Sequence, residues 1–322
     1  MFASIEECCD ALLNDNVAAI PTETVYGLAA NALSEDAVKK IYALKGRPSQ
    51  NPLIVHILDS SAAKTIAEPN DLFLKLTERY WPGPLTLVLD SKPLVPFITR
   101  GGLDSVALRS PKCKIFRKCL KRTDLLLAAP SANLSNRISP TSAEHVRENF
   151  GLKSVHILDG GSTSIGIEST ILDIRGEVPK LLRHGPIGKS ELELFIGLPI
   201  SSQIDYEENN QKSPGMSAFH YSPITPLTVY KNLQDLEASL PDSNATVILP
   251  SKMDTETDIS SEIIFLSEDG NTHEISKNLF SSFHIADKCN TSEIKCTLLD
   301  EKSDFACAVN DRILRAGSFK GS

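Results

Sequence analysis

The chain has 322 residues, of which 41% are hydrophobic and 23% charged, and its formal net charge at pH 7 is −8. This composition excludes wholesale disorder, collagen-like repeats and long coiled coils. At roughly 100–200 residues per domain, the length predicts two domains.

Hydrophobic periodicity predicts alternating helices and strands along the first two hundred residues. Ser34, Glu35 and Asp36 indicate the capped start of a helix that runs to about Leu44. The predicted helices cover 5–13, 35–44, 72–80, 141–150 and 189–194, and the predicted strands cover 17–20, 53–58, 85–89, 105–109, 125–129, 155–158, 168–174 and 180–183. This alternation is typical of an α/β fold.

The segment 201–225 has a different composition, because charged and amide residues at 205–212 are followed by S-P-G-M at 213–216 and Y-S-P at 221–223. Such a segment predicts an extended linker. Beyond it, strands are expected at 227–230, 246–249, 263–266 and 293–298, and helices at 233–240, 275–286 and 305–314. We therefore expect a domain over 1–200, a linker over 201–225, and a smaller α/β domain with a parallel sheet over 226–322.

Location and redox state follow from the termini and the cysteines. No apolar run reaches the ~18–20 residues that span a bilayer, and the acidic start, M-F-A-S-I-E-E, is unlike an export signal. The seven cysteines include no Cys-x-x-Cys pair, and the histidines lack ligand spacing. We expect a cytoplasmic protein with reduced thiols, no membrane contact and no metal site.

The negative charge is unevenly distributed. Residues 1–200 carry 23 Lys+Arg and 22 Asp+Glu (23 − 22 = +1), whereas residues 201–322 carry 10 and 19 (10 − 19 = −9). A basic stretch over 100–122 contains Arg100, Arg109, Lys112, Lys114, Arg117, Lys118, Lys121 and Arg122. An anionic ligand suits the first part. A solvated cationic helix explains the stretch equally well.

Four polar clusters lie at ends of predicted strands, where open α/β sheets usually bind ligands. They are P-T-E-T-V-Y-G-L at 21–28, K-G-R-P-S-Q-N-P at 45–52 before His56, P-S-A-N-L-S at 130–135 before S-P-T at 139–141, and G-I-E-S-T at 166–170 before Arg183. Lys45 and Arg47 can neutralise a phosphate chain. Each cluster taken alone is also explained by turn chemistry, since Pro, Gly, Ser and Asn are typical of loops.

In this order, and with W-P-G-P-L-T at 81–86, the clusters resemble the YrdC/Sua5 family of threonylcarbamoyl-AMP synthases. The resemblance is dense over 17–190 and in the linker, where S-P-G-M at 213–216 and H-Y-S-P at 220–223 are similar to the signature of the long, Sua5-type members. Over 226–322 it rests on spacing and on A-V-N-D-R-I-L-R-A at 308–316. It implies a twisted, mixed sheet with an open cavity and a smaller Rossmann-like C-terminal domain.

The resemblance also implies a reaction in which L-threonine, bicarbonate and ATP give L-threonylcarbamoyl-adenylate, pyrophosphate and water. The product would pass to the tRNA threonylcarbamoyl transferase machinery for t6A37 modification, and tRNA contact is an open possibility. Carried over residue by residue, the threonine pocket falls on Thr24, His56, Arg109, Ala129 and Ser169. The ATP contacts fall on Lys45, Arg47, Asn51, Ser105, Ser131, Asn133, Ser139, Arg183 and Tyr221. Mg²⁺ is expected to arrive with ATP, and no tightly bound cofactor is expected.

These residue types suit that chemistry. The carbamate of threonine and ATP are both anionic, so fixed cations must offset their approach. Arg109 can hold the threonine carboxylate, Lys45 and Arg47 can act catalytically on the triphosphate, and no residue needs to be a covalent nucleophile. Tyr221 would close over the nucleotide and exclude water. The alternatives are a core role for His56, a surface position for Arg183 and a simple linker anchor for Tyr221.

Two other functions are weighed against this one. R-H-G-P-I-G-K-S at 183–190 nearly matches a phosphate-binding loop, but it lacks the first glycine, and Pro186 removes a backbone donor. A non-catalytic RNA-binding module would use the basic stretch over 100–122, although the chain is acidic and has one Trp. The final domain could serve assembly or regulation. No Gly-x-Ser-x-Gly elbow supports a hydrolase.

Overall fold

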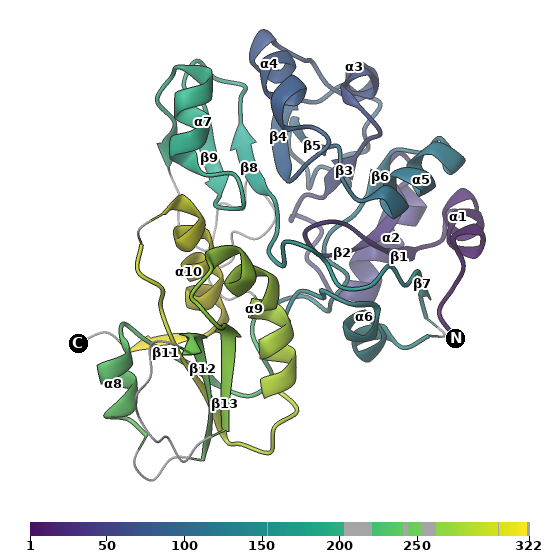
Figure 1. The fold of residues 1–322 in the computed structure, drawn as a ribbon. Coiled ribbons are helices and arrows are strands. Elements are labelled where there is room, and N and C mark those ends of the chain that lie inside the picture. Colours follow the sequence, from purple (N-terminus) through teal and green to yellow (C-terminus); the bar gives the residue numbers. More distant parts are fainter. Residues whose placement is uncertain (153, 203–220, 241–243, 253–261, 302, 321–322) are drawn as a thin grey trace.

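The computed structural model describes residues 1–152, 154–202, 221–240, 244–252, 262–301 and 303–320. Most of the predicted linker, including 205–216 and His220, lies outside these residues, whereas Tyr221 is described. The described residues form two sheets, one of ten strands and one of five. The ten-stranded sheet belongs to what we call the N-terminal region (1–202), and the five-stranded sheet to the C-terminal region (221–320) (Figure 1).

The first sheet mixes parallel and antiparallel pairs in the order β10-β9-β8-β4-β5-β3-β6-β2-β1-β7. Its strands are β1 Ala18–Pro21, β2 Tyr26–Asn31, β3 Ile54–His56, β4 Leu85–Asp90, β5 Ser105–Arg109, β6 Leu127–Ala128, β7 His156–Ile157, β8 Thr170–Asp173, β9 Lys180–Arg183 and β10 Ser201–Ser202. The predicted mixed sheet is confirmed: β1 is antiparallel to β2 but parallel to β7.

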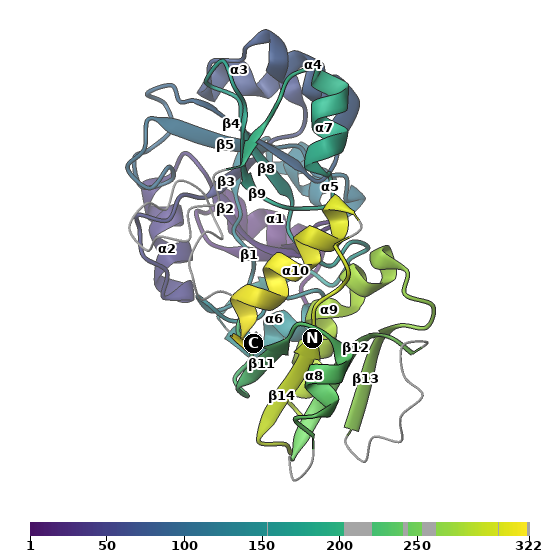
Figure 2. The same ribbon diagram turned by 90° about the vertical axis from the view of Figure 1, so that its left-hand side faces the viewer.

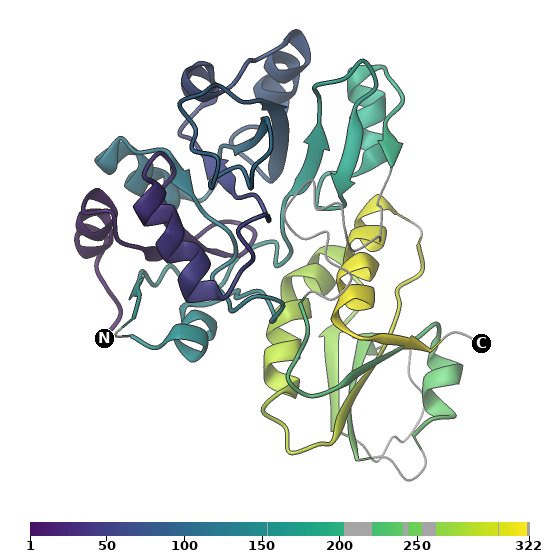
Figure 3. The ribbon, with the colours of Figure 1, turned by 180° about the vertical axis from the view of Figure 1, so that it is seen from behind.

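Helices lie around this sheet (Figures 1 and 3). They are α1 Ile5–Leu13, α2 Glu35–Lys45, the 3-10 turn Ser60–Ala62, α3 Ala63–Ile66, α4 Asp71–Tyr80, α5 Lys114–Thr123, α6 Ala143–Phe150 and α7 Lys189–Ile196. The predicted cap of α2 is present, because the Ser34 side chain accepts a hydrogen bond from the Ala37 N–H.

The second sheet is parallel throughout, in the order β13-β12-β14-β11-β15. Its elements are β11 Leu227–Tyr230, α8 Leu233–Glu237, β12 Ala245–Ser251, β13 Glu262–Ser267, α9 Thr272–Ala286, β14 Glu293–Thr297, α10 Asp304–Ala316 and β15 Ser318–Lys320. The predicted parallel α/β arrangement is confirmed. The strands β2, β10 and β15 (a three-residue edge strand) and the short helix α3 were not predicted from the sequence.

Helices α9 and α10 lie between the second sheet and the N-terminal region, as Figures 1 and 2 both show. One hydrophobic cluster crosses this seam: Ile138, Ile167 and Tyr221 pack in it with Phe280 and Phe283 of α9. The two regions therefore share a core, and residues of α9 and α10 reach the part of the first sheet where the polar clusters meet.

Candidate functional site

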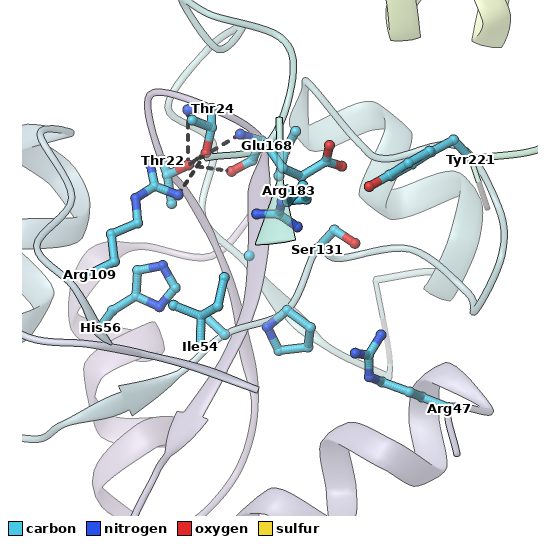
Figure 4. Close-up of a pocket in the computed structure, with 14 residues that line it drawn as sticks. Thr22, Thr24, Arg47, Ile54, His56, Arg109, Ser131, Glu168, Arg183 and Tyr221 are labelled. Atoms are coloured by element: carbon cyan, nitrogen blue, oxygen red, sulfur yellow. Dashed lines mark hydrogen bonds between the residues drawn. The ribbon is translucent and has the colours of Figure 1, made fainter. Parts of the chain in front are cut away.

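The polar clusters surround one cavity with about 540 Å³ of empty space (Figure 4). Its walls are formed by Thr22, Thr24, Val25, Gly27, Arg47, Ile54, His56, Arg109, Ala129, Pro130, Ser131, Glu168, Arg183 and Tyr221. In the view of Figure 4, Arg109, Thr24 and His56 lie at one end, and Arg47 and Tyr221 at the other. Eight of the fourteen predicted site residues, from all four clusters and the linker, line this space.

The turn between β1 and β2 carries Thr24 into the cavity. The Thr22 hydroxyl donates to the Val25 carbonyl at 2.7 Å and accepts from the N–H groups of Thr24 and Val25, so Thr22 closes the turn. Residues 22–25 therefore form a fixed support, and the Thr24 hydroxyl lies 3.0 Å from Nη1 of Arg109. Turn chemistry and a binding role coexist in this cluster.

Arg109, at the end of β5, is held by three groups. It donates to the Gly83 carbonyl at 3.3 Å, to Thr24 Oγ1 at 3.0 Å and to Glu23 Oε1 at 2.6 Å. The Glu23 carboxylate also accepts from the N–H groups of Lys112 and Cys113. Burial alone would raise the pKa of Glu23, but the Arg109 guanidinium and these donors hold it below its ordinary value. A guanidinium has five N–H groups, so two have no partner among the residues that the structure describes and can bind a ligand.

His56 ends β3 beside Arg109. Burial, with a smaller contribution from the Arg109 charge, lowers the pKa of His56 to about 3, so its imidazole is neutral. Its Nδ1 is buried and has no hydrogen-bond partner among the described residues. The ring also lies 5.1 Å from that of Phe116. His56 therefore combines the packing of a core histidine with a ring that faces the cavity.

Glu168 and Arg183 occupy the centre of the cavity wall in Figure 4. Arg183 donates to the Ser169 carbonyl at 3.0 Å and to its hydroxyl at 3.1 Å, and that hydroxyl also pairs with Thr86 Oγ1 at 2.8 Å. Burial lowers the pKa of Arg183 to about 10, so it remains a cation. Ser169 lies directly behind this wall rather than in it.

The loop after α2 supplies a second guanidinium. Gly46 ends α2 in a left-handed conformation (φ 61°), and Arg47 then donates to the carbonyls of Asn51 and Pro52, both at 3.3 Å. Its side chain enters the cavity (Figure 4). Asn51 itself is buried behind Arg47, where its carbonyl also accepts from the Tyr42 hydroxyl.

Lys45 occupies a different position from the one its sequence pattern suggests. Its ammonium donates to the carbonyls of Ser131 and Asn133, both at 2.5 Å, and it does not line the cavity. Complete burial and the nearby Arg47 lower the pKa of Lys45. Lys45 therefore fixes the loop that presents Ser131, and its direct action on a triphosphate remains a prediction.

Other predicted nucleotide contacts also lie outside the cavity wall. Asn133 bonds its own loop through the carbonyls of Leu134 and Arg137, and Ser105 lies within β5. Ser139 donates to Glu168 Oε1 at 2.5 Å, one step behind the wall. These residues surround the cavity lining, whereas Ala129, Ser131 and Tyr221 form part of it.

The prediction from sequence omitted six lining residues. They are Thr22, Val25, Gly27, Ile54, Pro130 and Glu168. The first five belong to, or directly adjoin, clusters that had already been identified, so extending each cluster along its strand would have found them. Glu168 was visible as the one acid in the G-I-E-S-T cluster. Burial would raise the pKa of Glu168, but Arg312 and Arg183 outweigh it, so the group is an anion.

The alternative phosphate-binding loop at 183–190 is blocked as an anion site. The N-terminus of α7 receives a carboxylate from the C-terminal region: the Ser190 N–H donates to Asp304 Oδ2 at 2.6 Å. Its glycine, Gly188, is closely covered, because an added Cβ would lie 2.6 Å from the Asp304 side chain. The phosphate-binding-loop hypothesis is therefore not supported by this geometry.

The basic stretch over 100–122 does not form one surface. Arg100 and Arg109 are buried and bonded internally, and Arg117 donates to the Leu58 carbonyl. The exposed cations are Lys112, Lys114, Lys118, Lys121 and Arg122. Within the described ranges, no three His, Cys, Asp or Glu side chains gather as a metal site. None of the helices that the structure describes is long and apolar enough to cross a membrane.

Two family models match successive parts of the chain. Residues 10–185 match the Sua5–YciO–YrdC family, described as "Telomere recombination", and residues 187–318 match "Threonylcarbamoyl-AMP synthase, C-terminal domain". The boundary between the two matches falls before α7, ahead of the predicted linker.

Relatives of known name cover most of the chain. The threonylcarbamoyl-AMP synthase of Pyrococcus abyssi is 38% identical over 314 residues, which are 94% of this chain and 90% of the relative. That of Bacillus subtilis is 49% identical over 225 residues, 68% of this chain and 64% of the relative. A crystal structure of P. abyssi Sua5 complexed with L-threonine has a TM-score of 0.89 at 37% identity, covering 97% of this chain and 93% of that one.

Proposed function

The chain belongs to the Sua5–YciO–YrdC family of enzymes, of the nucleotidyltransferase type, and from that premise we propose that it synthesises L-threonylcarbamoyl-adenylate. In this reaction L-threonine, bicarbonate and ATP give the adenylate, pyrophosphate and water. The observation that carries the proposal is how the cavity divides its residues. Among the lining residues, Thr24, His56 and Arg109, predicted to hold threonine, lie at one end of the cavity, and Arg47 and Tyr221, predicted to hold ATP, lie at the other (Figure 4).

The threonine end suits an amino acid with a carboxylate and a hydroxyl. Arg109 has two N–H groups left for a bidentate pair with the carboxylate, and Glu23 and Gly83 fix its orientation. Thr24 and neutral His56 supply short polar contacts. A crystal structure of a relative that contains L-threonine supports this choice of amino acid.

The nucleotide end and the centre of the cavity together suit a polyphosphate. Arg47 and Arg183 present two buried guanidinium groups, which offset charge as the carbamate oxygen attacks the α-phosphorus and pyrophosphate leaves. Fixed cations in a site with little water require little reorganisation during the reaction. The protein's contribution is then mainly orientation, which in favourable cases supplies roughly 7–11 kcal/mol. Mg²⁺ enters with ATP as part of the substrate.

We propose that Tyr221 excludes water from the adenylate. It is buried in the cavity wall, packs against Phe280 of α9, and burial raises its pKa to about 12, so the phenol is neutral. Tyr221→Ala would lower the adenylate yield and increase ATP hydrolysis. An unchanged yield, with no extra hydrolysis, would remove this role.

The product is a mixed anhydride, which another enzyme must use. We propose that it is passed to the tRNA threonylcarbamoyl transferase machinery for t6A37 modification in the cytoplasm. The name shared by the relatives supports the synthesis of the adenylate. Adding the transferase machinery and tRNA to the reaction tests the transfer to tRNA.

Mass detection of the adenylate tests the proposed reaction directly. The protein is incubated with ATP, bicarbonate and each amino acid in turn, and a matched reaction omits bicarbonate. We expect the adenylate with L-threonine and none without bicarbonate. Equal use of L-serine would overturn the assignment of the threonine end. No adenylate with any amino acid would overturn the reaction, and salt-dependent tRNA affinity alone would favour an RNA-binding module.

A further inference from the structure

Arg312 connects the C-terminal region to the cavity. It lies on α10, its side chain has an exposed fraction of 0%, and its groups reach across the seam. Nε donates to Glu168 Oε2 at 2.9 Å, and an Nη2 hydrogen donates to the His184 carbonyl at 2.8 Å. Nη1 donates to Asp311 Oδ2 at 2.6 Å, within α10. Its guanidinium carbon is also 5.5 Å from the centre of the Tyr221 ring.

Two of the groups that Arg312 contacts line the cavity, Glu168 at its centre and Tyr221 at the nucleotide end. Glu168 lines the cavity, and its other carboxylate oxygen accepts from Ser139, a predicted ATP contact. Tyr221 lines the same space. Arg312 thus touches one lining side chain directly through an ion pair, a second through its ring face, and Ser139 through Glu168.

A second helix of the C-terminal region, α9, contacts the segment that leads into β8. Ser276 of α9 donates to the Ile165 carbonyl at 2.7 Å. The next residue, Gly166, has φ +89°, and an added Cβ would lie 2.3 Å from the Ser276 carbonyl oxygen. Residues 165–168 are therefore fixed between α9 and α10 just before β8 begins.

The threonine end is held by other groups. Ser169 is fixed by Thr86 and Arg183, and Arg109 by Glu23, Thr24 and Gly83. All of these residues belong to the N-terminal region. Losing Arg312 would leave these hydrogen bonds in place.

We propose that Arg312 is a positioning residue for the nucleotide end of the active site, supplied by the C-terminal region. It orients Glu168, and through it Ser139, and sets the plane on which Tyr221 packs. This inference rests on the proposed function. It assigns the C-terminal region a part in ATP binding beyond that of Tyr221, which lines the cavity itself.

A buried ion pair can also serve stability alone, so the test must separate the two roles. Arg312→Met removes the charge, Arg312→Lys keeps it, and Asn310→Ala is the matched control. Asn310 is also buried on α10, but among the described residues its side chain bonds the backbone of Leu299 alone, within the C-terminal region. For each variant, calorimetry gives the affinities for L-threonine and ATP, steady-state assays give KM and kcat, and thermal unfolding gives stability.

We expect Arg312→Met to weaken ATP binding and raise KM for ATP roughly 10–100-fold, because displacements near 1 Å have effects of this size. L-Threonine affinity should stay within about twofold. Arg312→Lys should recover part of the ATP affinity. Asn310→Ala should lower the unfolding temperature and leave the ATP affinity unchanged. If Arg312→Met does not fold, the comparison of Arg312→Lys with Asn310→Ala decides.

The proposal is overturned if ATP affinity in the Arg312 variants matches that of Asn310→Ala, or if L-threonine and ATP affinities fall together. A wild-type protein that binds ATP but forms no adenylate would contradict the proposed function instead. In that case the calorimetric ATP affinities still decide the role of Arg312.

Discussion

The two regions both bury charged groups, but those of the N-terminal region face a cavity and those of the C-terminal region pair with other protein groups. In the N-terminal region, Arg47, Arg109 and Arg183 face a cavity. In the C-terminal region, Asp311, Arg312 and Arg315 lie buried together on α10, and Arg312 faces the other region. Burying an ion costs several kcal/mol unless a partner offsets it. The first group faces a space that a ligand can enter, whereas the second is paired within the protein.

This difference teaches that a residue can affect a site without lining it, as Arg312 does in the proposal above. The cavity takes its polar atoms from the loops after β1, α2 and β6 and before β8, from the ends of β3, β5 and β9, and from Tyr221. The C-terminal region controls where one of those loops lies. The comparison predicts that changes at the cavity alter activity most, that changes at the buried seam alter activity and stability together, and that changes at the exposed seam alter neither much.

The largest effect is expected for Arg109→Met. This change removes the carboxylate-binding group and leaves Glu23 buried without its cation. We expect kcat/KM for L-threonine to fall at least 10²–10³-fold and the free energy of unfolding to fall by about 3–5 kcal/mol. Steady-state kinetics and urea denaturation measure the two.

A double variant separates the two effects of that change. Adding Glu23→Gln to Arg109→Met should restore part of the stability, because no buried charge is left unpaired, while activity stays low. If the double variant regained activity, Arg109 would serve only to neutralise Glu23. Arg109 would then resemble the charged groups of α10, which are paired within the protein, and the difference between the two regions would not hold for it.

Gly166→Ala tests the buried seam. Its positive φ disfavours any side chain, and the added Cβ would meet the backbone of α9. We expect a loss of about 3 kcal/mol or more in the free energy of unfolding. The control is Gly197→Ala, where φ is also positive (+76°) but nothing lies within 4 Å, so the expected loss is about 1–2 kcal/mol. Equal losses would mean that the backbone of α9 can move away from the added Cβ at little cost in free energy.

Local patterns predicted much of the framework and the site. The capped helix predicted at 35–44 corresponds to α2, and the strand predicted at 105–109 corresponds to β5. Each prediction used a signal that lies within a few neighbouring residues. By contrast, β2 was missed. Its sequence, Y-G-L-A-A-N, begins inside a turn motif and has little β-branched character, so only pairing with β1 and β6 reveals it.

The charge partners were out of reach for a different reason. Glu23 is 86 positions from Arg109, and Glu168 is 144 from Arg312. Lys45 looked like a phosphate ligand from its loop, but its partners are two carbonyls 86 and 88 positions away. Sequence predicts that a cation is near a cavity, and the tertiary fold decides whether it faces a ligand or a carbonyl.

An intermediate effect is expected from pH, through a histidine pair at the seam. His145 of α6 stacks on His284 of α9 with ring centres 3.8 Å apart. Burial, with repulsion from His284, lowers the pKa of His145 to about 3, and burial lowers that of His284 to about 4. The charged neighbours Glu148 and Lys288 act on His145 in opposite directions.

The unfolded chain, with an ordinary histidine pKa near 6.5, binds protons that the folded pair does not. Stability from each histidine is therefore present above pH 6.5 and is lost as the pH falls toward 4. Between pH 7 and 5 the loss is about 2 kcal/mol per histidine.

Denaturant titrations at pH 7, 6 and 5 measure this dependence. His284→Phe keeps a ring in the stack and should reduce the loss between pH 7 and 5, since Nε2 of His284 has no hydrogen-bond partner among the described residues. The control is His156→Phe, at an exposed position on β7, which should leave the wild-type slope unchanged. If the free energy of unfolding of His284→Phe changed with pH as it does in the wild type, His284 could be charged in the folded protein without a loss of stability.

The smallest effect is expected for Lys288→Ala. Lys288 and Glu148 form an ion pair across the same seam at 2.6 Å, as short as the Arg109–Glu23 pair, but their side chains are 59% and 37% exposed. Water already solvates both groups, so the pair should contribute no more than about 0.5 kcal/mol and less in high salt. Urea denaturation at low and high salt, with unchanged ATP affinity, checks this. A loss comparable to that of Gly166→Ala would mean that exposed charge holds the regions together, and burial would then not be what distinguishes Arg312 from Lys288.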